Sequence, residues 1–424
     1  MKLFWNFFYD FLFLPAFYLV VSIGGIFNKK IREGIKGRNR LFEELILNVT
    51  TLDRRKRRVW LHSSSMGEFE QAKPIIEQLK KNPNIYIIVS FFSPSGYNNS
   101  RKYPNADLIT YIAFDTRTNA KKFLDILKPD LAVFMRYDIW PNHIWQLKKQ
   151  EIPVYLVDAT MRKSSLRKVP VLKSFHKTLF KDITKILTVS EADAAGFKSF
   201  GCGNDKVSIV GDTRFDRVYQ KSLLAKERNL IKFSILENKK VFVAGSTWDQ
   251  DEEVILPAFI KLAKFDKDVI LIIAPHEPTI LHLEKIENEI TGNLSTIRFS
   301  HLNNYSGEKV IIVDSIGILL TLYTYADLAF VGGSFKQNVH NVLEAAVYGI
   351  PVIYGPKIEN SQEAVNLIEQ GGGMIINNKR EAYRLIRTLF SDDALRKACG
   401  KNAYDYVQKN IGTTQKIINE FSKL

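Results

Sequence analysis

The sequence predicts an α/β protein made of two doubly wound Rossmann-like domains, preceded by an N-terminal hydrophobic membrane anchor. Short apolar segments alternate with amphipathic helical stretches over most of the chain, which is the pattern of parallel sheets covered by helices. The length of 424 residues exceeds what one hydrophobic core usually organises. Residues 11–27 form a run of 17 residues without a charge. These three observations give the two domains and the anchor.

The uncharged run at residues 11–27 is predicted to be the membrane anchor. A secretory signal would carry positive charge before its apolar core and small residues after it, whereas here the basic residues follow the run. That order predicts a protein body on the cytoplasmic face of the cell inner membrane. The run is short for a spanning helix and contains Pro15, so a single span and an interfacial helix both remain open. A buried core helix is the alternative.

The charge distribution favours a membrane surface as the partner. The formal net charge is +15, and residues 29–58 hold eleven Lys and Arg against four Asp and Glu. Basic clusters beside an anchor attract anionic lipids of the inner leaflet, whereas nucleic-acid binding would interleave basic and aromatic residues along the globular part. We therefore expect inner-leaflet anionic lipids and no nucleic acid. The two distant cysteines, Cys202 and Cys399, predict a reduced protein without structural zinc.

The apolar segments fall into two groups, and each group predicts one parallel sheet. We predict an anchor over residues 1–28, a first domain over 29–215, a linker over 216–232 and a second domain over 233–424. Two such domains are expected to leave a cleft at the carboxyl ends of their strands, where open α/β sheets bind ligands. The predicted strands are residues 59–64, 85–91, 108–112, 131–135, 152–157 and 185–190, and then 239–246, 268–275, 309–314, 328–333 and 351–355.

Residues 327–356 predict a nucleotide site. They read as a buried strand, a glycine turn, a polar loop, a helix starting near Asn341 and a second buried strand. This arrangement presents backbone amides and a helix N-terminus to a phosphate. Glu344, one turn past Asn341, could accept hydrogen bonds from ribose hydroxyls. The alternative is a capping box, with Asn341 as the N-cap and Glu344 bound back to its amide.

Glu68 is the candidate general base. It follows the first predicted strand at the start of a helix, where a carboxylate can take the proton from an acceptor hydroxyl. The alternative is that the helix dipole alone favours a glutamate there. His62 and the serines at 63–65 have no suitably placed acid and no GxSxG pattern, so we expect them to line a loop.

No metal site is expected from the sequence. Asp266 and Asp268 have DxD spacing, but they lie between a helix and a strand, away from the expected carboxyl edge. For Trp140, both packing and sugar stacking remain open. For His340, beside Asn341, a packing role and a functional role likewise both remain open.

Seven short motifs resemble the 3-deoxy-D-manno-octulosonic acid (Kdo) transferases in order and spacing. The resemblance extends from the anchor to beyond residue 375 and includes the GxKGR stretch at 34–38. It implies a GT-B glycosyltransferase that moves Kdo from CMP-Kdo to lipid A precursor (lipid IVA), by an inverting, metal-independent reaction of lipopolysaccharide biosynthesis. The motifs are HSSSMGE (62–68), MRYDIWPN (135–142), GDTRFD (211–216), AGSTWDQDEE (244–253), APHEP (274–278), DSIGIL (314–319) and FVGGSFKQNVHNVLEAA (330–346).

The resemblance also assigns catalytic roles. Glu68 matches the general base, Asp138 matches an acidic residue that assists the transition state, and Arg214 matches a lysine with a similar role. Asp138 is one methylene shorter than the usual glutamate. Arg214 differs from lysine in geometry, although both changes keep the charge.

The segments that hold CMP in the family match nine residues of the second half. Ile318 stands where the family commonly has glutamate, which removes a side-chain acceptor and leaves backbone contact. No cofactor is implied, and the implied partners are CMP-Kdo and lipid A precursor. The nine residues are Pro275, His276, Ile316, Gly317, Ile318, Asn341, Val342, Leu343 and Glu344.

Two other classes of function remain open. One is another nucleotide-sugar enzyme of the same build, such as a lipid-disaccharide synthase or a UDP-sugar 2-epimerase, although an epimerase needs no anchor. The other is a non-catalytic lipid-phosphate binding module, against which Glu68 argues. The sequence predicts neither the number of Kdo units transferred nor the oligomeric state.

Overall fold

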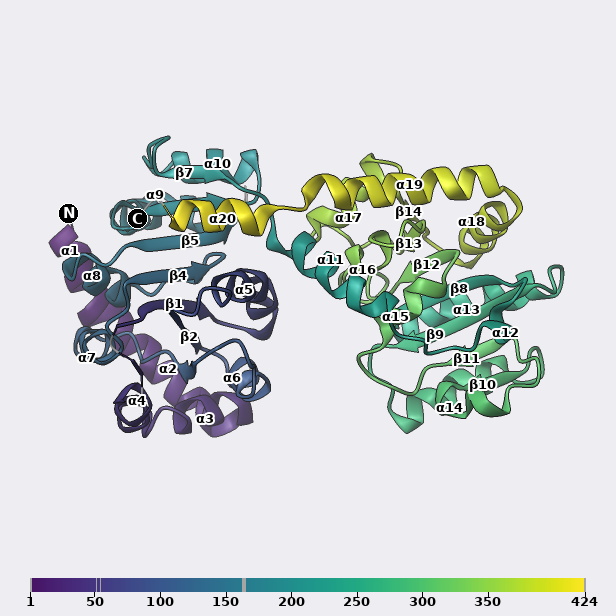
Figure 1. Cartoon of the computed structure of the whole chain (residues 1–424), viewed down its shortest axis with the longest axis horizontal. Coiled ribbons are helices and arrows are strands. Elements are labelled where there is room, and N and C mark those ends of the chain that lie inside the picture. The colour runs from purple at the N-terminus through teal and green to yellow at the C-terminus, as the bar shows by residue number, and fades with distance from the viewer. Residues whose placement is uncertain (1, 51, 54, 162–164, 423–424) are drawn as a thin grey trace. The chain divides into compact units, whose positions relative to one another are not determined.

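The computed structural model describes residues 2–50, 52–53, 55–161 and 165–422. The chain divides into two compact units, one formed by Met1–Arg217 with Gly412–Leu424 and the other by Val218–Ile411 (Figure 1). Each unit is built around one seven-stranded sheet whose paired strands are all parallel. The predicted fold class, two doubly wound α/β domains with an N-terminal apolar helix, is confirmed.

The first unit contains a sheet in the order β3-β2-β1-β4-β5-β6-β7. Its central strands are buried on both faces, which is why they read as continuous apolar runs in the sequence. The strands are β1 Arg57–Ser63, β2 Ile85–Phe91, β3 Leu108–Tyr111, β4 Leu131–Met135, β5 Val154–Ala159, β6 Lys185–Thr188 and β7 Val207–Ile209.

Helices cover both faces of this first sheet. Trp60 and Phe134 point to a core shared with α7 and α8, whereas Leu61 and Val133 point to a core shared with α5 and α20. The helices of this unit are α1 Lys2–Phe8, α2 Leu14–Phe27, α3 Lys29–Lys36, α4 Leu41–Thr50, α5 Met66–Leu79, α6 Pro94–Ser100, α7 Arg117–Leu127, α8 Pro141–Lys149, α9 Pro170–Lys181, α10 Glu191–Lys198 and α20 Thr413–Phe421.

The predicted anchor is a helix that packs along the body of the first unit. A π-helical turn at Tyr9–Phe13 joins α1 and α2, and the span Lys2–Phe27 is long and apolar enough to cross a membrane by length and composition. Tyr9 and Leu14 are buried in the core of the unit. The Tyr9 hydroxyl donates to Asp115 Oδ2 at 2.7 Å, and Lys2 Nζ lies 2.5 Å from Asp182 Oδ2.

The second unit contains a sheet in the order β10-β11-β9-β8-β12-β13-β14. Its core places Phe242, Leu271 and Phe330 against α13, α14 and α18. The strands are β8 Lys240–Thr247, β9 Val269–Pro275, β10 Thr296–Arg298, β11 Val310–Ile312, β12 Leu328–Val331, β13 Val352–Tyr354 and β14 Gly373–Ile375. The helices are α12 Phe233–Leu236, α13 Asp249–Ala263, α14 Ile280–Ile290, α15 Leu319–Leu322, α16 Leu343–Ala346, α17 Gln362–Glu369, α18 Lys379–Ser391 and α19 Asp393–Asn410.

Three strands were missing from the prediction. The strands β7, β10 and β14 each contain three residues and each lies at the end of a sheet. Edge strands are partly exposed and need few apolar residues, so these three lack the continuous apolar run that predicted β11 and β13, which have the same length but are fully buried.

The domain boundaries also differ from the prediction at two places. The stretch expected as a linker, 216–232, largely falls in α11, Thr213–Lys226, which runs through the boundary between the units. The C-terminal residues expected in the second domain belong to the first unit. Ile417 and Phe421 of α20 are buried in the core of the first unit, so the apolar face of this helix packs there and not in the second unit.

Candidate active site

The carboxyl ends of β1 and β4 meet at the centre of the first sheet. The chain continues from β1 to β2 on one side and from β4 to β5 on the other, so the two neighbouring strands form the switch point of the sheet. Ligands of doubly wound sheets bind at such points. Glu68 follows β1 and Asp138 follows β4, and the structure therefore brings these two predicted residues to the same edge.

Glu68 is held at the start of α5 by the turn after β1. Ser65 is the N-cap, and the Ser64 backbone amide donates to Glu68 Oε2 at 2.6 Å. Burial raises the pKa of the Glu68 carboxyl and the negative charge of Asp138 raises it further, against lowering contributions from Ser64, His62 and Arg136. A carboxylate with a raised pKa near a second acid is suited to accept a proton.

His62 connects Asp138 to the interior of the sheet. Its Nε2 lies 3.1 Å from Asp138 Oδ2, and its Nδ1 lies 2.8 Å from Ser90 Oγ. Trp140 Nε1 donates towards the same Asp138 oxygen at 3.1 Å, and Trp60 Nε1 donates to Ser90 Oγ at 2.8 Å.

One proton arrangement satisfies every donor in this network. If His62 Nε2 carries the proton, it donates to Asp138, while the Ser90 hydroxyl donates to His62 Nδ1 and accepts from Trp60. Trp140 Nε1 also lies 3.1 Å from His62 Nε2, so the opposite tautomer could accept from it, but that tautomer would also turn the lone pair of Nε2 towards a carboxylate oxygen. We therefore assign the Nε2–H tautomer. His62, expected as a loop-lining residue, is instead a fully buried strand residue that orients Asp138.

Trp140 is a packing residue in this structure. Its ring stacks on Phe92 with 4.8 Å between centroids, and it begins the turn into α8. Its indole nitrogen bonds Asp138, so the packing also fixes that carboxylate.

Arg136 is a charged residue at this edge that the sequence reasoning did not single out. Its backbone has φ of +61°, in the left-handed region that non-glycine residues rarely adopt. Its charge acts on Glu68 and on Asp212. Among the described residues, none accepts a hydrogen bond from its buried Nε. The strained backbone in MRYDIWPN has no sequence signal, but an arginine two residues before the candidate acid could have been noted.

Arg214 lies at the same end of the sheet, at the start of α11. Its Nε and one terminal nitrogen donate to Asp212 Oδ2 at 2.9 and 2.6 Å. Burial alone would raise the pKa of Asp212, but the paired Arg214 holds it below its ordinary value. For the adjacent Asp158, burial and the charge of Asp212 raise the pKa. The arginine is thus fixed by one ionised carboxylate.

The second unit has a switch point between β8 and β12. Trp248 follows β8, His276 follows β9 and His340 lies in the loop after β12. The two imidazoles stack with 4.3 Å between centroids, and Trp248 Nε1 donates to His340 Nε2 at 3.0 Å. Burial and the neighbouring His276 lower the pKa of His340 to about 4, which keeps this acceptor neutral.

The two glycines of the turn after β12 do not offer the amides that the sequence suggested. The Gly332 amide donates to Gly245 O at 2.9 Å, and the Gly333 amide donates to Asp251 Oδ2 at 2.8 Å. These donors are used within the fold, so a phosphate would have to meet others. Within the described part of the chain, the backbone amides of Asn341 and Val342 have no acceptor.

The helix after this turn is short, as expected, and has no capping box. It begins at Leu343, spans Leu343–Ala346, and has Val342 as its N-cap without a side-chain bond. Asn341 Oδ1 accepts from the Leu343 amide at 3.3 Å, and Asn341 Nδ2 donates to Glu344 Oε1 at 3.1 Å. The capping-box alternative is therefore wrong, and a helix of one turn contributes little dipole to an anion.

The remaining matched residues differ in accessibility. Pro275, Val342 and Leu343 are buried, so only their backbones could touch a ligand. His276, Ile316, Gly317 and Asn341 are exposed, and Ile318 and Glu344 are half-buried. All lie at or after the carboxyl ends of β9, β11 or β12, which are at one edge of the second sheet.

Two groups of acidic residues in the second unit have the spacing or the composition of a metal site. Asp266 pairs with Lys240 at 2.7 Å and, as predicted, lies away from the carboxyl edge, since it precedes β9. Among the described residues, Asp249, Glu252 and His282 come close enough together to share an ion. His282 bonds Glu252 at 2.9 Å and Lys285 bonds Asp249 at 3.2 Å, so these groups neutralise one another.

The GxKGR stretch has a structural role. Arg38 is buried and donates to the carbonyls of Ile112, Gly34 and Phe92 at 2.9, 2.7 and 2.8 Å. Its guanidinium also lies over three aromatic rings. This positive charge is therefore enclosed in the fold rather than offered to a membrane.

Comparison with known proteins identifies the family. A family model described as 3-deoxy-D-manno-octulosonic-acid transferase matches residues 38–217. A 3-deoxy-D-manno-octulosonic acid transferase from Rickettsia typhi is 30% identical over 86% of this chain and 78% of its own length. The chain belongs to the Kdo transferase family. It is therefore a glycosyltransferase.

Other Kdo transferases match almost end to end. The enzyme from Rickettsia bellii is 28% identical, over 99% of this chain and 97% of its own. A bifunctional glycosyltransferase/methyltransferase from Fusobacterium nucleatum is 30% identical, but this chain spans only about half, 52%, of that relative.

Solved structures of other proteins have the same fold. A UDP-GlcNAc 2-epimerase from Neisseria meningitidis has a TM-score of 0.59 at 18% identity, over 86% of this chain and 98% of that one. MurG from Acinetobacter baumannii has a TM-score of 0.57 at 13% identity, over 87% of this chain and 100% of that one. At these identities the likeness shows the fold alone.

Proposed function

We propose that this Kdo transferase family member moves Kdo from CMP-Kdo to a hydroxyl of lipid A precursor, with inversion, in lipopolysaccharide core biosynthesis. The observation that supports it most is Glu68, a carboxylate of raised pKa at the switch point of the first sheet beside Asp138. Glu68 takes the proton of the acceptor hydroxyl while that oxygen bonds to the anomeric carbon. The bond from this carbon to the phosphate oxygen breaks, and its electron pair leaves with CMP.

The leaving phosphate is assigned to donors of this chain. In the first unit, Arg214, held by Asp212, is a fixed positive charge for an anionic group of a substrate. In the second unit, the Asn341 and Val342 amides are neutral donors for the phosphate. The positive charge of Arg136 lies at the same edge of the first sheet and acts on Glu68. Such preorganised donors can stabilise developing negative charge, and the proposed reaction needs no divalent ion.

We further propose that the N-terminal helix lies in the plane of the inner leaflet. Along one side it docks on the first unit, where Asp10 accepts from Asn142 at 2.8 Å and pairs with Arg117 at 2.7 Å. A spanning helix would have to break these contacts and place Asp10 in hydrocarbon. The other side exposes large apolar residues, including Phe4 at 62% and Phe11 at 64%, as an interfacial helix requires.

The test is a transfer reaction with purified full-length protein. We expect CMP-Kdo and tetraacylated lipid A precursor to give CMP and a lipid product heavier by whole Kdo units, with the same rate in EDTA. The mass of the product also gives the number of units. Turnover of UDP-sugars without any product from CMP-Kdo would overturn the proposal in favour of an epimerase or disaccharide synthase.

A further inference from the structure

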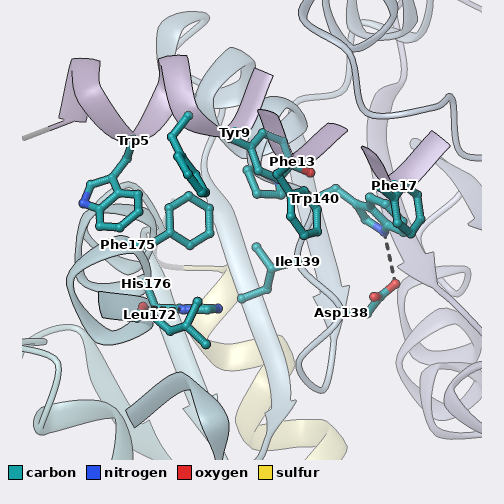
Figure 2. Close-up of a pocket in the computed structure, with 12 residues that line it drawn as sticks. Trp5, Tyr9, Phe13, Phe17, Asp138, Ile139, Trp140, Leu172, Phe175 and His176 are labelled. Carbon is teal, nitrogen blue, oxygen red and sulfur yellow. Dashed lines mark hydrogen bonds between the residues drawn. The ribbon is translucent and has the colours of Figure 1, made fainter. Parts of the chain in front are cut away.

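An apolar cavity of about 340 Å³ lies between the N-terminal helix and the body of the first unit. Figure 2 shows four aromatic side chains of the helix, spaced four residues apart, along one wall of the cavity: Trp5, Tyr9, Phe13 and Phe17. The opposite side is formed by Leu172, Phe175 and His176 of α9, and by Ile139 and Trp140 after β4.

The lining of this cavity suits a hydrocarbon. Of the side chains that line it, Asp138 is the one that is charged, and it lies at one end beside Trp140 (Figure 2). His176 is neutral because burial lowers its pKa to about 4, and its Nδ1 lies 2.7 Å from the Leu172 carbonyl oxygen. A ligand in this space therefore meets apolar surface along its length and the catalytic edge at one end.

The surroundings of the cavity point to a chain that comes from a membrane. The helix that forms one wall exposes Phe4, Phe7 and Phe11 on its outer side. The helix that forms the other wall exposes Val171 and Leu172, with Lys173 next to them in the sequence and Lys177 four residues after Lys173. Exposed aromatic and aliphatic residues next to lysines are the composition of surfaces that enter the headgroup region of anionic leaflets.

We propose that this cavity binds one acyl chain of the lipid acceptor and so orients the acceptor hydroxyl towards Asp138 and Glu68. The inference rests on the proposed function, because it names the part of that substrate that the first unit holds. An apolar cavity of ~150 Å³ already accommodates benzene, so about 340 Å³ has room for an acyl segment of roughly a dozen carbons. The helix is then a wall of the acceptor site as well as an anchor.

The test compares two acceptors in the same detergent micelles. One is the tetraacylated glucosamine disaccharide bisphosphate, and the other is the same disaccharide without acyl chains. Leu172→Trp places a larger side chain at the cavity, and Leu224→Trp is the matched control on an exposed helical position of the second unit. We expect Leu172→Trp to lower the ratio of kcat/KM for the acylated over the deacylated acceptor roughly 10-fold or more, and Leu224→Trp to leave the ratio unchanged.

Two further measurements make the outcomes distinct. With wild-type protein, shortening the acyl chains should lower kcat/KM stepwise, and both variants should keep the wild-type melting temperature. If Leu172→Trp leaves the ratio of the two kcat/KM values unchanged and instead sediments more weakly with phosphatidylglycerol vesicles, the cavity binds a bilayer lipid. That result would overturn this inference without affecting the proposed function. Wild-type protein that transfers Kdo to neither acceptor would overturn the proposed function as well.

Discussion

At the scale of single residues, the candidate site is an acidic pair whose two members are held by different means. Glu68 is fixed by its own backbone turn, through the Ser64 amide. Asp138 is fixed from the side, by His62 and Trp140. The short side chain of Asp138 is therefore accompanied by two ring donors that reach it.

Replacement of Glu68 by glutamine should separate catalysis from folding. We expect transfer to fall ~10²- to 10⁴-fold, the usual contribution of a general base. Because the folded protein raises the pKa of Glu68, the fold binds its proton more tightly than the unfolded chain does, and ionisation lowers stability as pH rises. The melting temperature of Glu68→Gln should therefore equal or exceed that of wild type at pH 7, and this gain should vanish below the ordinary glutamate pKa of ~4.3.

The same shift gives the pH dependence of the wild-type reaction. Transfer should rise with pH through the raised pKa of Glu68, because the base acts only when ionised. The measurement is kcat/KM for the lipid acceptor against pH. Comparable transfer by Glu68→Gln, or a rate that already levels off near pH 4.3, would remove Glu68 as the base.

Two replacements of His62 should separate its links to Ser90 and Asp138. Glutamine can place a donor near the position of Nε2 and keep the bond to Asp138, whereas asparagine can keep only the partner at Nδ1, Ser90. Both leave a buried polar group unpaired, which costs about 1–3 kcal/mol. Denaturant unfolding should show similar losses, while kcat should be retained better in His62→Gln. Equal kcat values would show that the bond to Asp138 has no part in the reaction.

At the scale of elements, the loops after the central strands of each sheet carry the candidate residues, and in the second unit the turn after β12 is tightly constrained. Gly333 has φ of +99°, and a Cβ there would lie 2.3 Å from the Asn338 carbonyl oxygen and 2.8 Å from the His340 ring. A glycine is thus needed here because the backbone of Gly333 lies close to Asn338 and His340 of the same loop. This close packing positions His340 and Asn341. The glycine is not needed to free its amide for a ligand, since that amide bonds Asp251.

Gly333→Ala should be far more damaging than the same change at Gly292. Both glycines have positive φ, but an added Cβ at Gly292 meets open space, so it isolates the cost of the backbone conformation, about 1–2 kcal/mol. Gly333→Ala should lose more stability than this control in denaturant unfolding, and it should also weaken CMP binding by calorimetry. Equal losses in the two variants would show that the loop relaxes around the new methyl group.

At the scale of the whole molecule, both ends of the chain are structural parts of the first unit. The N-terminal helix buries Tyr9 and Leu14, and the C-terminal helix α20 buries Ile417 and Phe421. The Asp216 carboxylate accepts from the amides of Gly412 and Thr414 at 2.6 Å each, which fixes the start of α20. The first unit is therefore complete only after the second has been synthesised.

Ile417→Ala should destabilise the first unit although it lies near the C-terminus. Truncation of a fully buried isoleucine costs about 2–5 kcal/mol. Hydrogen exchange should accelerate in β1, β4 and α5, whereas Lys416→Ala, an exposed position in the same helix, should change nothing. Faster exchange confined to the second unit would contradict the division described above.

The sequence by itself determined what depends on local pattern. Continuous apolar runs gave the long central strands, the uncharged N-terminal run gave the helix, and contiguous motifs gave the family and the candidate residues Glu68, Asp138 and Arg214. These features follow from the period of the side chains or from neighbours in the chain, so no other part of the molecule is needed to see them.

Only the tertiary structure decided the features that join distant residues. The order of the strands brought Glu68 and Asp138 to one switch point and set His62 between Asp138 and Ser90. Packing places the N-terminal helix along one side of a cavity and places α20 in the first unit. It also pairs the Gly332 and Gly333 amides with acceptors inside the fold. Each of these depends on contacts between residues far apart in sequence, whose partners have no fixed spacing along the chain.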